Sequence, residues 1–364
     1  MMRSKNTFER SKILIVGGYG QVGRSIAERL APGFPGRVTI AGRNQHKANT
    51  VAAEVGHGSQ GRGMDIFAPD AGRALDDVAL VLVCLDQTDT QFAAQCLSRG
   101  IHYVDISADH TFLSRIDALD GLAQTNSATG VLSVGTAPGL TNLLAARAKQ
   151  KMARLDRIDI LLEIGLGDRH GRAAVEWMFD NLDASYDIRE NGAARRVRSL
   201  GESMALALPG QSKRRAAYRF NFSDQHVLGR TLGVASVSTW VRFDNRLSTW
   251  LFAVSSRAGL GRLLRRKFWR KLGVWLFMNV HIGSDICGVA VQARGQTESG
   301  AEELTIGIVG RREALMTAII AAETVRQVLT ANPGPGVFHS EEVIALDPVI
   351  AALKRAFPDL VVAV

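Results

Sequence analysis

The sequence predicts an α/β fold, with a doubly wound parallel sheet followed by a second, α+β domain built on a mostly antiparallel sheet. The first observation is the apolar run from Ile13 to Val16, which is typical of a strand buried on both faces and ends in glycines before a helix. The second is the alternation of such strands with helices up to Lys151, and the third is a change to mainly strands beyond Ala153. We therefore expect a Rossmann-type dinucleotide-binding domain over residues 1–145, a substrate and oligomerisation domain over 146–310, and C-terminal helices over 311–364 that return to the first domain.

The glycine-rich turn after the first strand fits a pyrophosphate. In the frame Gly18-x-Gly20-x-x-Gly23, the first glycine permits the turn, the second lets the backbone approach the phosphates, and the third lets the helix pack on the strand. The free N–H groups at the start of that helix bind anions. A purely structural glycine turn is the alternative, but the strand before it and the helix after it favour a nucleotide. The expected contacts in this motif are Gly18, Tyr19, Gly20, Gln21, Val22 and Gly23.

The end of the second strand indicates which nicotinamide cofactor is bound. An NAD site usually places Asp or Glu about 20 residues past the glycines, where it accepts hydrogen bonds from the ribose. Here the strand from Val38 to Ala41 is followed by Gly42, Arg43 and Asn44, with no acid. A guanidinium suits a 2′-phosphate because it is a rigid, permanently charged fork of donors. We predict NADP(H), with Arg43 as the main contact and Asn44 beside it; the alternative is that Arg43 and Lys47 form a solvated turn and helix face.

The composition is that of an ordinary globular protein with a basic balance. The chain has 364 residues and a formal charge of +9, which favours anionic ligands such as a phosphorylated cofactor or a carboxylate substrate. No nucleic-acid-binding module is recognisable. The cysteines Cys84, Cys96 and Cys287 lack the spacing of a zinc site, so we expect no metal and a reducing compartment. Neither a secretion signal nor a clean apolar span of about 20 residues is visible, which predicts a cytoplasmic protein.

Polar residues after the later strands are further candidates for cofactor contact. Asp65 ends a short third strand where this architecture usually passes the adenine, although capping a helix near Ala68 is an equal alternative. Leu85 and Gln87 follow the apolar strand that begins at Ala79, at the carboxyl end where ligands bind in parallel sheets.

A second informative stretch follows the sixth strand. The segment from Gly135 to Asn142 leads into a helix and places backbone amides and Thr136 at the carboxyl edge of the sheet. We expect the nicotinamide end of the cofactor nearby. The alternative is that this segment is a tight connection between domains. The segment could also have both roles.

The second domain contains a basic amphipathic stretch over residues 260–278. We favour a helix that packs its apolar face on the sheet or on a partner subunit, because internal amphipathic helices are common. The alternative is that it lies on an anionic membrane surface through Trp269, Trp275 and Phe277. A strong helix from Arg312 to Leu329 is expected to return to the first domain.

Five motifs, in this order, resemble the saccharopine dehydrogenase (saccharopine reductase) family. They are Gly17–Gly23, Ala41–Arg43, Tyr103–Ile106, Gly135–Asn142 and Gly334–Val337. The resemblance implies a nicotinamide-dependent oxidoreductase whose second domain is inserted before a C-terminal return to the nucleotide fold. It also implies that Gly18, Gly20, Gln21, Val22 and Gly23 hold the pyrophosphate, that Arg43 holds the 2′-phosphate, and that Thr136 and Ala137 lie near the nicotinamide.

The chemistry implied by this resemblance is hydride transfer between nicotinamide C4 and the carbon of a C=N bond. One group must manage the proton of amine condensation, with a pKa near neutrality. His170 is a candidate, in a segment where Arg169 or Arg172 could hold a substrate carboxylate beside a helix N-terminus. A polar surface loop is the alternative. Asp105 is a second candidate, although it could instead order the local backbone.

These observations leave three hypotheses open. The leading one is an NADP(H)-dependent oxidoreductase that acts on a C–N bond of a small, carboxylate-bearing, amino-acid-derived substrate, in a homodimer. The second is a reductase of a carbonyl or an activated C=C bond. The third is a non-catalytic NADP(H)-binding sensor or scaffold, because the sequence shows no obvious catalytic dyad.

Overall fold

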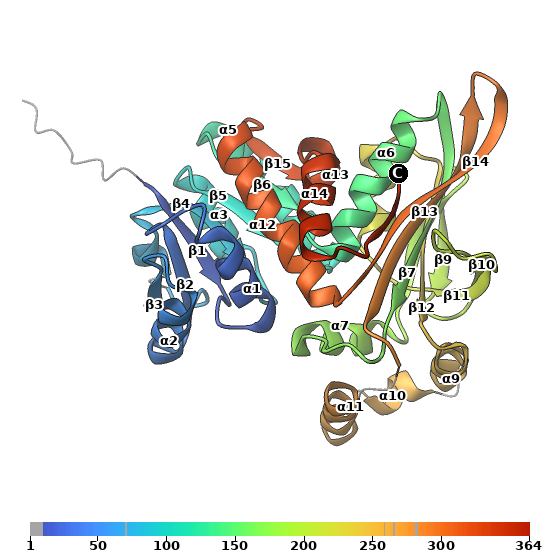
Figure 1. Cartoon of the computed structure of the whole chain (residues 1–364), viewed down its shortest axis with the longest axis horizontal. Coiled ribbons are helices and arrows are strands. Elements are labelled where there is room, and N and C mark those ends of the chain that lie inside the picture. The colour runs from blue at the N-terminus through green and yellow to red at the C-terminus, as the bar shows by residue number, and fades with distance from the viewer. Residues whose placement is uncertain (1–9, 70, 258, 265, 281–282) are drawn as a thin grey trace, which may run out of the picture. The chain divides into compact units, whose positions relative to one another are not determined.

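The computed structural model describes residues 10–69, 71–257, 259–264, 266–280 and 283–364. The chain forms two compact units (Figure 1). Unit 1 comprises the residues up to Ser107 together with Thr111–Leu132 and Ala321–Phe338. Unit 2 comprises Ala108–His110, Ser133–Ile320 and His339–Val364.

Unit 1 is built on a seven-stranded sheet of order β15-β6-β5-β4-β1-β2-β3. The pairings from β6 to β3 are all parallel, and β1 and β4 carry apolar side chains on both faces because helices cover both sides. This confirms the predicted doubly wound sheet. Its strands are β1 (Lys12–Val16), β2 (Val38–Gly42), β3 (Gln60–Gly63), β4 (Val78–Val83), β5 (His102–Asp105), β6 (Thr129–Leu132) and β15 (Gly336–His339).

The helices of unit 1 bury one apolar face each. In α1 the buried residues Gly23, Ile26, Ala27 and Leu30 recur at helical spacing. The helices are α1 (Gln21–Leu30), α2 (Gln45–Val55), a short 3-10 helix (Ala71–Leu75), α3 (Gln91–Ser98), α4 (His110–Asp117) and α5 (Asp120–Thr125).

Unit 2 is built on a second seven-stranded sheet of order β10-β11-β12-β7-β13-β14-β16. Only β12 and β7 pair in parallel, so the predicted mostly antiparallel sheet is confirmed. A separate hairpin, β8–β9, turns at Asn191 and Gly192, which both adopt the positive φ that such a turn requires. The strands are β7 (Arg154–Ile164), β8 (Ser185–Glu190), β9 (Ala193–Arg198), β10 (Ser203–Leu206), β11 (Arg215–Arg219), β12 (Ser236–Phe243), β13 (Ile286–Thr297), β14 (Gly300–Arg311) and β16 (Val361–Ala363).

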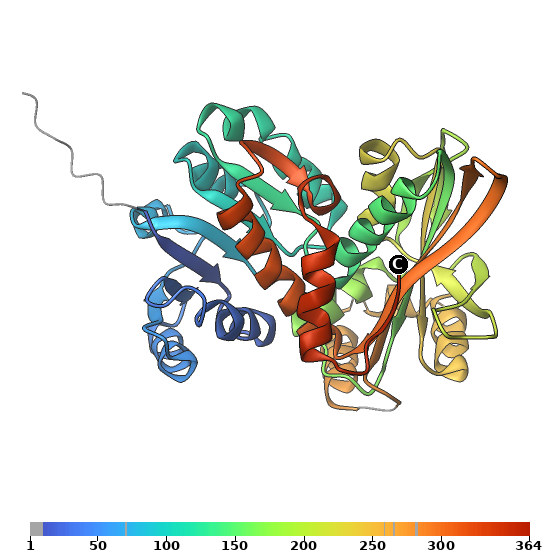
Figure 2. The ribbon, with the colours of Figure 1, turned by 45° about the horizontal axis from the view of Figure 1, so that its top comes forward.

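The helices of unit 2 divide into those that touch its sheet and those that do not. Helix α6 packs along β13 and β7 (Figure 2), and α8 and α9 pack on β12. The helices are α6 (Thr141–Gln150), which follows an irregular turn (Thr136–Leu140), α7 (Arg172–Asn181), α8 (Asp224–Thr231), α9 (Arg246–Arg257), α10 (Leu260–Leu264), α11 (Lys267–Asn279), α13 (Ser340–Val343) and α14 (Leu346–Ala356).

The C-terminal part of the chain differs from the prediction. Helix α12 (Glu313–Ala331) forms as expected, and its residues from Ala321 onward belong to unit 1. The residues from His339 onward join unit 2 instead, because β16 adds to the edge of its sheet by pairing with β14. Three residues are too few to show a strand period, so the sequence did not reveal this return.

Helix α12 is apolar over most of its length, although Glu313, Glu323 and Arg326 interrupt it. It is the one helix in the described ranges that is long and apolar enough to cross a membrane, but 72% of its apolar window is buried. That burial is typical of a core helix in a folded domain.

The basic amphipathic stretch differs in part from the favoured prediction, whereas its packing on a partner subunit stays a prediction. It forms two helices, α10 and α11, rather than one, and these pack on each other and on α7 instead of on the sheet. Much of its apolar surface stays exposed, including 70% of Phe268 and 59% of Trp275.

Candidate functional site

The turn between β1 and α1 has the geometry of a pyrophosphate site. The Gly20 N–H donates to the Gly17 carbonyl at 2.9 Å, and α1 starts directly after it with no acidic residue in its first turn. A Cβ on Gly23 would lie 2.5 Å from the Gly17 oxygen, and one on Gly18 would lie 2.7 Å from the Ile15 oxygen. The glycines thus keep the turn tight, and the first N–H groups of α1, in Gln21 and Val22, present the positive end of the helix dipole. These residues fit a dinucleotide phosphate.

The loop after β2 supplies a cation for a 2′-phosphate. Arg43 is exposed and makes no hydrogen bond or ion pair with any residue in the described part of the chain. The Asn44 side chain accepts from Lys47 N at 3.0 Å and so caps α2, which leaves only its amide group for a cofactor. The Tyr19 ring covers Gly42, where a Cβ would lie 2.4 Å from Tyr19 Cε1. The loop therefore fits NADP(H), with Arg43 as its available charge.

Asp65 and Leu85 have local structural contacts in unit 1. Asp65 Oδ1 accepts from Phe67 N at 3.1 Å, a turn contact that resembles the capping alternative. Leu85 packs against the main apolar cluster of this unit.

The side chains of Gln87 and Asp105 are hydrogen-bonded to each other at the carboxyl end of β5. Gln87 Nε2 donates to Asp105 Oδ2 at 2.8 Å and to Tyr103 Oη at 2.7 Å, and the Tyr103 hydroxyl donates to the same carboxylate at 2.6 Å. Asp105 is fully buried, and burial raises its pKa to about 6. Ser107 N also donates to it, at 2.7 Å. Asp105 thus orders the backbone at this sheet edge, as its alternative role predicted, and it belongs to unit 1 whereas His170 belongs to unit 2.

Within unit 2, the turn that carries Thr136 is bound to the start of α12. Thr136 N donates to Thr317 Oγ1 at 3.1 Å, and the two hydroxyl oxygens lie 3.0 Å apart. Thr317 Oγ1 also donates to Glu313 Oε1 at 3.0 Å. Ala137 follows in extended backbone, with φ −151°. The loop expected near the nicotinamide is therefore linked by hydrogen bonds, through Thr317, to the carboxylate of Glu313.

The segment that contains His170 is bound to the backbone of the same Glu313. Asp168 Oδ2 accepts from Glu313 N at 2.7 Å and so caps the start of α12. Burial raises the pKa of Glu313, and the nearby His170 opposes part of that rise. His170 Nε2 lies 3.1 Å from the Gly165 oxygen, and its ring centroid lies 5.6 Å from that of Phe277.

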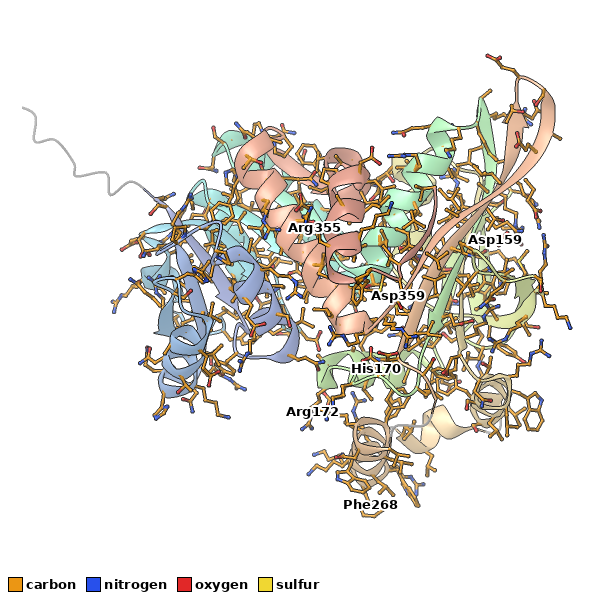
Figure 3. The ribbon with its side chains drawn as sticks, viewed as in Figure 1. Asp159, His170, Arg172, Phe268, Arg355 and Asp359 are labelled. Atoms are coloured by element: carbon orange, nitrogen blue, oxygen red, sulfur yellow. The ribbon has the colours of Figure 1, made fainter. Side chains whose placement is uncertain are left out.

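The two predicted arginines lie at the surface of this segment. Arg172 is exposed by 67% and its guanidinium pairs with Glu176 one turn later, at 2.8 Å (Figure 3). This ion pair weakens its predicted role in holding a substrate carboxylate. Arg169 is also exposed, and its N–H donates to Asp168 Oδ1 at 2.7 Å.

Glu313 and Thr317 could not be recognised as site residues from the sequence. Each stands inside a long apolar helix, and a lone carboxylate or hydroxyl at the start of such a helix is an ordinary feature. The structure also brings three further histidines into unit 2: His110 stacks on His226 with centroids 4.4 Å apart, and His339 Nδ1 lies 2.8 Å from Ser133 Oγ. Burial lowers the pKa of both His226 and His339 to about 3, so both are neutral hydrogen-bonding groups near pH 7.

Metal binding has no visible basis in the described ranges. No group of three or more His, Cys, Asp and Glu side chains in them is arranged to hold a metal ion.

A glycine turn before a helix, a free arginine after the second strand and a parallel sheet define a dinucleotide-binding protein of the α/β class. Residues 13–134 match the saccharopine dehydrogenase NADP binding domain. The predicted resemblance to this family and the predicted NADP(H) cofactor are therefore confirmed over these residues. A comparison with curated protein sequences found no match.

Comparison with solved structures shows a shared fold over 97% of the chain in one case. Apo saccharopine dehydrogenase (L-Glu forming) from Saccharomyces cerevisiae is 14% identical, with a TM-score of 0.65 over 97% of this chain and 100% of that one. C. glutamicum DAP dehydrogenase in complex with DAP is 15% identical, with a TM-score of 0.46 over 94% of this chain and 98% of that one. GenD2 from gentamicin A biosynthesis, in complex with NAD, is 14% identical, with a TM-score of 0.43 over 100% and 99%. At such identities, the first likeness shows a common fold alone.

Proposed function

We propose that this protein is an NADP(H)-dependent oxidoreductase that transfers a hydride to or from the C=N carbon of a small, amino-acid-derived substrate. One observation carries the proposal: Thr136, Thr317 and Glu313 form one hydrogen-bonded chain in unit 2. Asp168 joins the His170 segment to the same Glu313. NADP(H), when bound, supplies or accepts the hydride at C4 of its nicotinamide.

The protein's own residues then have to hold the substrate and move one proton. An iminium already carries positive charge, so positioning dominates the hydride step. His170 is the group proposed to move the proton of amine condensation. Because its Nε2 faces the Gly165 carbonyl and would donate to it, Nδ1 is the nitrogen left as a base.

A carboxylate-bearing substrate suits the charge of this segment. Arg169 is exposed next to His170, and Arg172 already has Glu176 as its counter-ion. We propose that Arg169 and Arg172, the two arginines of this segment, hold the substrate carboxylate.

The proposal is tested by following NADPH oxidation with paired amines and oxo acids. Turnover that requires both partners, and that is lost in His170→Gln with NADPH affinity retained, supports it. Turnover with a carbonyl or activated C=C substrate in the absence of an amine would favour the second class of reductase. Tight NADPH binding without turnover across a broad panel would favour a sensor or scaffold.

A further inference from the structure

The exposed apolar residues of this protein gather on one segment of unit 2. Of the 13 large apolar side chains that are exposed among the described residues, all but Phe67 and Val361 lie between Leu247 and Val280. Helices α9, α10 and α11, which this segment forms, lie at one end of unit 2 (Figure 1). Single exposed apolar residues are ordinary, but a contiguous group marks an interaction surface.

Two helices present this surface as ordered stripes. On α9, Leu247, Trp250, Leu251 and Val254 recur at helical spacing and are exposed by 62%, 54%, 48% and 38%. On α11, Phe268, Leu272, Trp275 and Leu276 do the same, exposed by 70%, 42%, 59% and 50%. Phe268 lies at the outer edge of unit 2 in Figure 3.

Both helices are anchored by their other faces, so the stripes belong to ordered structure. On α11, the Phe277 ring meets Phe179 of α7 with centroids 6.1 Å apart, and Arg270 pairs with Asp180. At the start of α9, Asn245 Oδ1 accepts from Leu247 N at 2.8 Å. Asp244 holds that turn by accepting from Asn245 N and from Ser284.

The charge of the segment is of one sign. Residues 246–280 contain eight Lys or Arg and no Asp or Glu. Lys267 and Lys271 are exposed beside the apolar stripe of α11. Basic residues flanking exposed Trp, Phe and Leu are typical of helices that lie in the headgroup region of a membrane.

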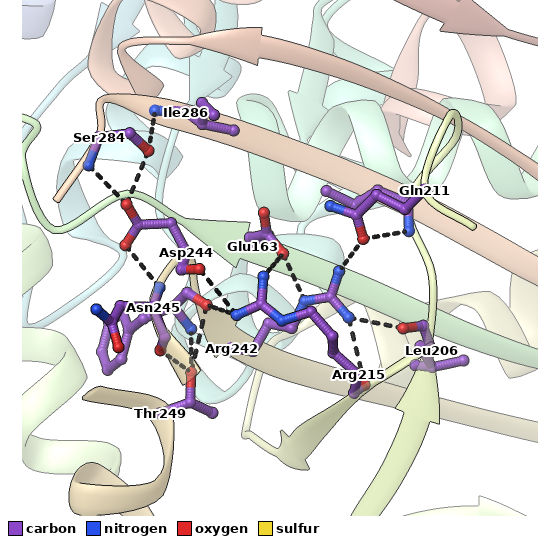
Figure 4. A network of polar contacts seen from close by, with 12 residues as sticks. Glu163, Leu206, Gln211, Arg215, Arg242, Asp244, Asn245, Thr249, Ser284 and Ile286 are labelled. Carbon is purple, nitrogen blue, oxygen red and sulfur yellow. Dashed lines mark hydrogen bonds and ion pairs between the residues drawn. The ribbon is translucent and has the colours of Figure 1, made fainter. Parts of the chain in front are cut away.

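A surface hollow beside α9 is lined by three arginines and could therefore bind an anion. It has a volume of about 310 Å³ and is lined by Arg214, Arg215, Ala216, Tyr218, Arg246, Thr249 and Trp250. Arg214 pairs with Glu303, and Arg215 bonds the Phe243 and Asp244 carbonyls (Figure 4). Arg246 makes no hydrogen bond or ion pair within the described ranges, so it is available for a phosphate.

We propose that the 246–280 surface docks this protein on an anionic phospholipid membrane. The stripes of α9 and α11 enter the headgroup region, Lys267 and Lys271 meet lipid phosphates, and Arg246 holds one headgroup in the hollow. A second copy of the chain fits the surface less well, because a self-complementary contact would bring the same positive charges face to face.

Vesicle flotation of the full chain tests this proposal. We expect binding to phosphatidylcholine vesicles that contain about one-third phosphatidylglycerol, and at least about tenfold weaker binding to pure phosphatidylcholine. Lys271→Gln and Arg246→Gln should each weaken binding about fivefold, since a basic residue near an anionic surface contributes about 1 kcal/mol. Trp275→Ser should weaken it at least about tenfold by removing apolar area.

Matched variants outside the surface should behave as wild type. Phe67→Ser removes a side chain that is 52% exposed in unit 1, and Lys354→Gln removes an exposed charge on α14. Circular dichroism and urea denaturation serve as the measure of folding for every variant. Failure of wild type to float with anionic vesicles, or equal flotation of Trp275→Ser and Phe67→Ser, would overturn the proposal. A dimer in sedimentation that Trp275→Ser dissociates would also overturn it, in favour of a second copy.

Discussion

Thr136 Oγ1 lies 3.0 Å from Thr317 Oγ1, although 181 residues separate them in the sequence. Thr136 belongs to the turn after β6, and Thr317 lies one helical turn beyond Glu313 in α12. Through this contact, the loop expected near the nicotinamide and the carboxylate beside His170 form one structure within unit 2. A substitution of Thr317 should therefore affect both the Thr136 loop and the Glu313 carboxylate.

We expect Thr317→Val to lower the free energy of unfolding by about 2 kcal/mol, because it leaves the buried Thr136 N–H without its acceptor. The substitution keeps the shape of the side chain and removes only the hydroxyl. Thr317→Ser restores the hydroxyl and should recover most of the loss. Urea denaturation measures both, and equal losses in the two variants would contradict a role for the hydrogen bonds.

Arg43→Ala should raise the Kd for NADPH about 10-fold to 100-fold, as expected for the loss of a charge-assisted contact to phosphate. The affinity for NADH, which has no 2′-phosphate, should stay the same. Isothermal titration with both nucleotides makes the comparison. Lys47→Ala, on the exposed face of α2, is the matched control, and an unchanged NADPH preference in Arg43→Ala would remove Arg43 from this role.

His170→Gln should lower kcat about 100-fold or more if His170 moves the proton of condensation. NADPH affinity should not change, because the nucleotide turn lies in unit 1. The control is His46→Gln, an exposed histidine at the start of α2. Steady-state kinetics on the substrate found in the panel gives the answer, and a full rate in His170→Gln would require another acid or base.

Acid should destabilise the protein through its buried histidines. Burial lowers the pKa of His226 from 6.5 to about 3, so below pH 6.5 the unfolded chain takes up a proton that the folded chain does not. The free energy of unfolding contributed by this residue therefore falls as pH falls, by about 2 kcal/mol between pH 6.5 and pH 5. His339 acts in the same direction.

Glu341 acts in the opposite direction and has to be separated from the histidines. Its pKa is raised from 4.5 to about 7 by burial, so it adds stability as pH falls through that window. The difference in unfolding free energy between wild type and His226→Gln isolates the histidine. We expect that difference to change by about 2 kcal/mol from pH 6.5 to pH 5. A pH-independent difference for His226→Gln would show that His226 is not protonated on unfolding.

The sequence by itself determined the nucleotide half of this protein. Strand burial, the spacing of Gly18, Gly20 and Gly23, and the arginine at position 43 are local properties, set by backbone sterics and by the chemistry of neighbouring residues. The change from a parallel to a mostly antiparallel sheet could likewise be predicted from local periodicity.

The tertiary structure alone decided which distant residues meet. Nothing local to Thr317 or Glu313 indicates Thr136 or Asp168 as a partner, and nothing local to Val361–Ala363 indicates pairing with β14. It also decided that Asp105 is enclosed by Tyr103 and Gln87, and that the apolar stripes of α9 and α11 face outward. Periodicity shows that a helix has an apolar face, but only the packing of its neighbours determines whether that face is covered.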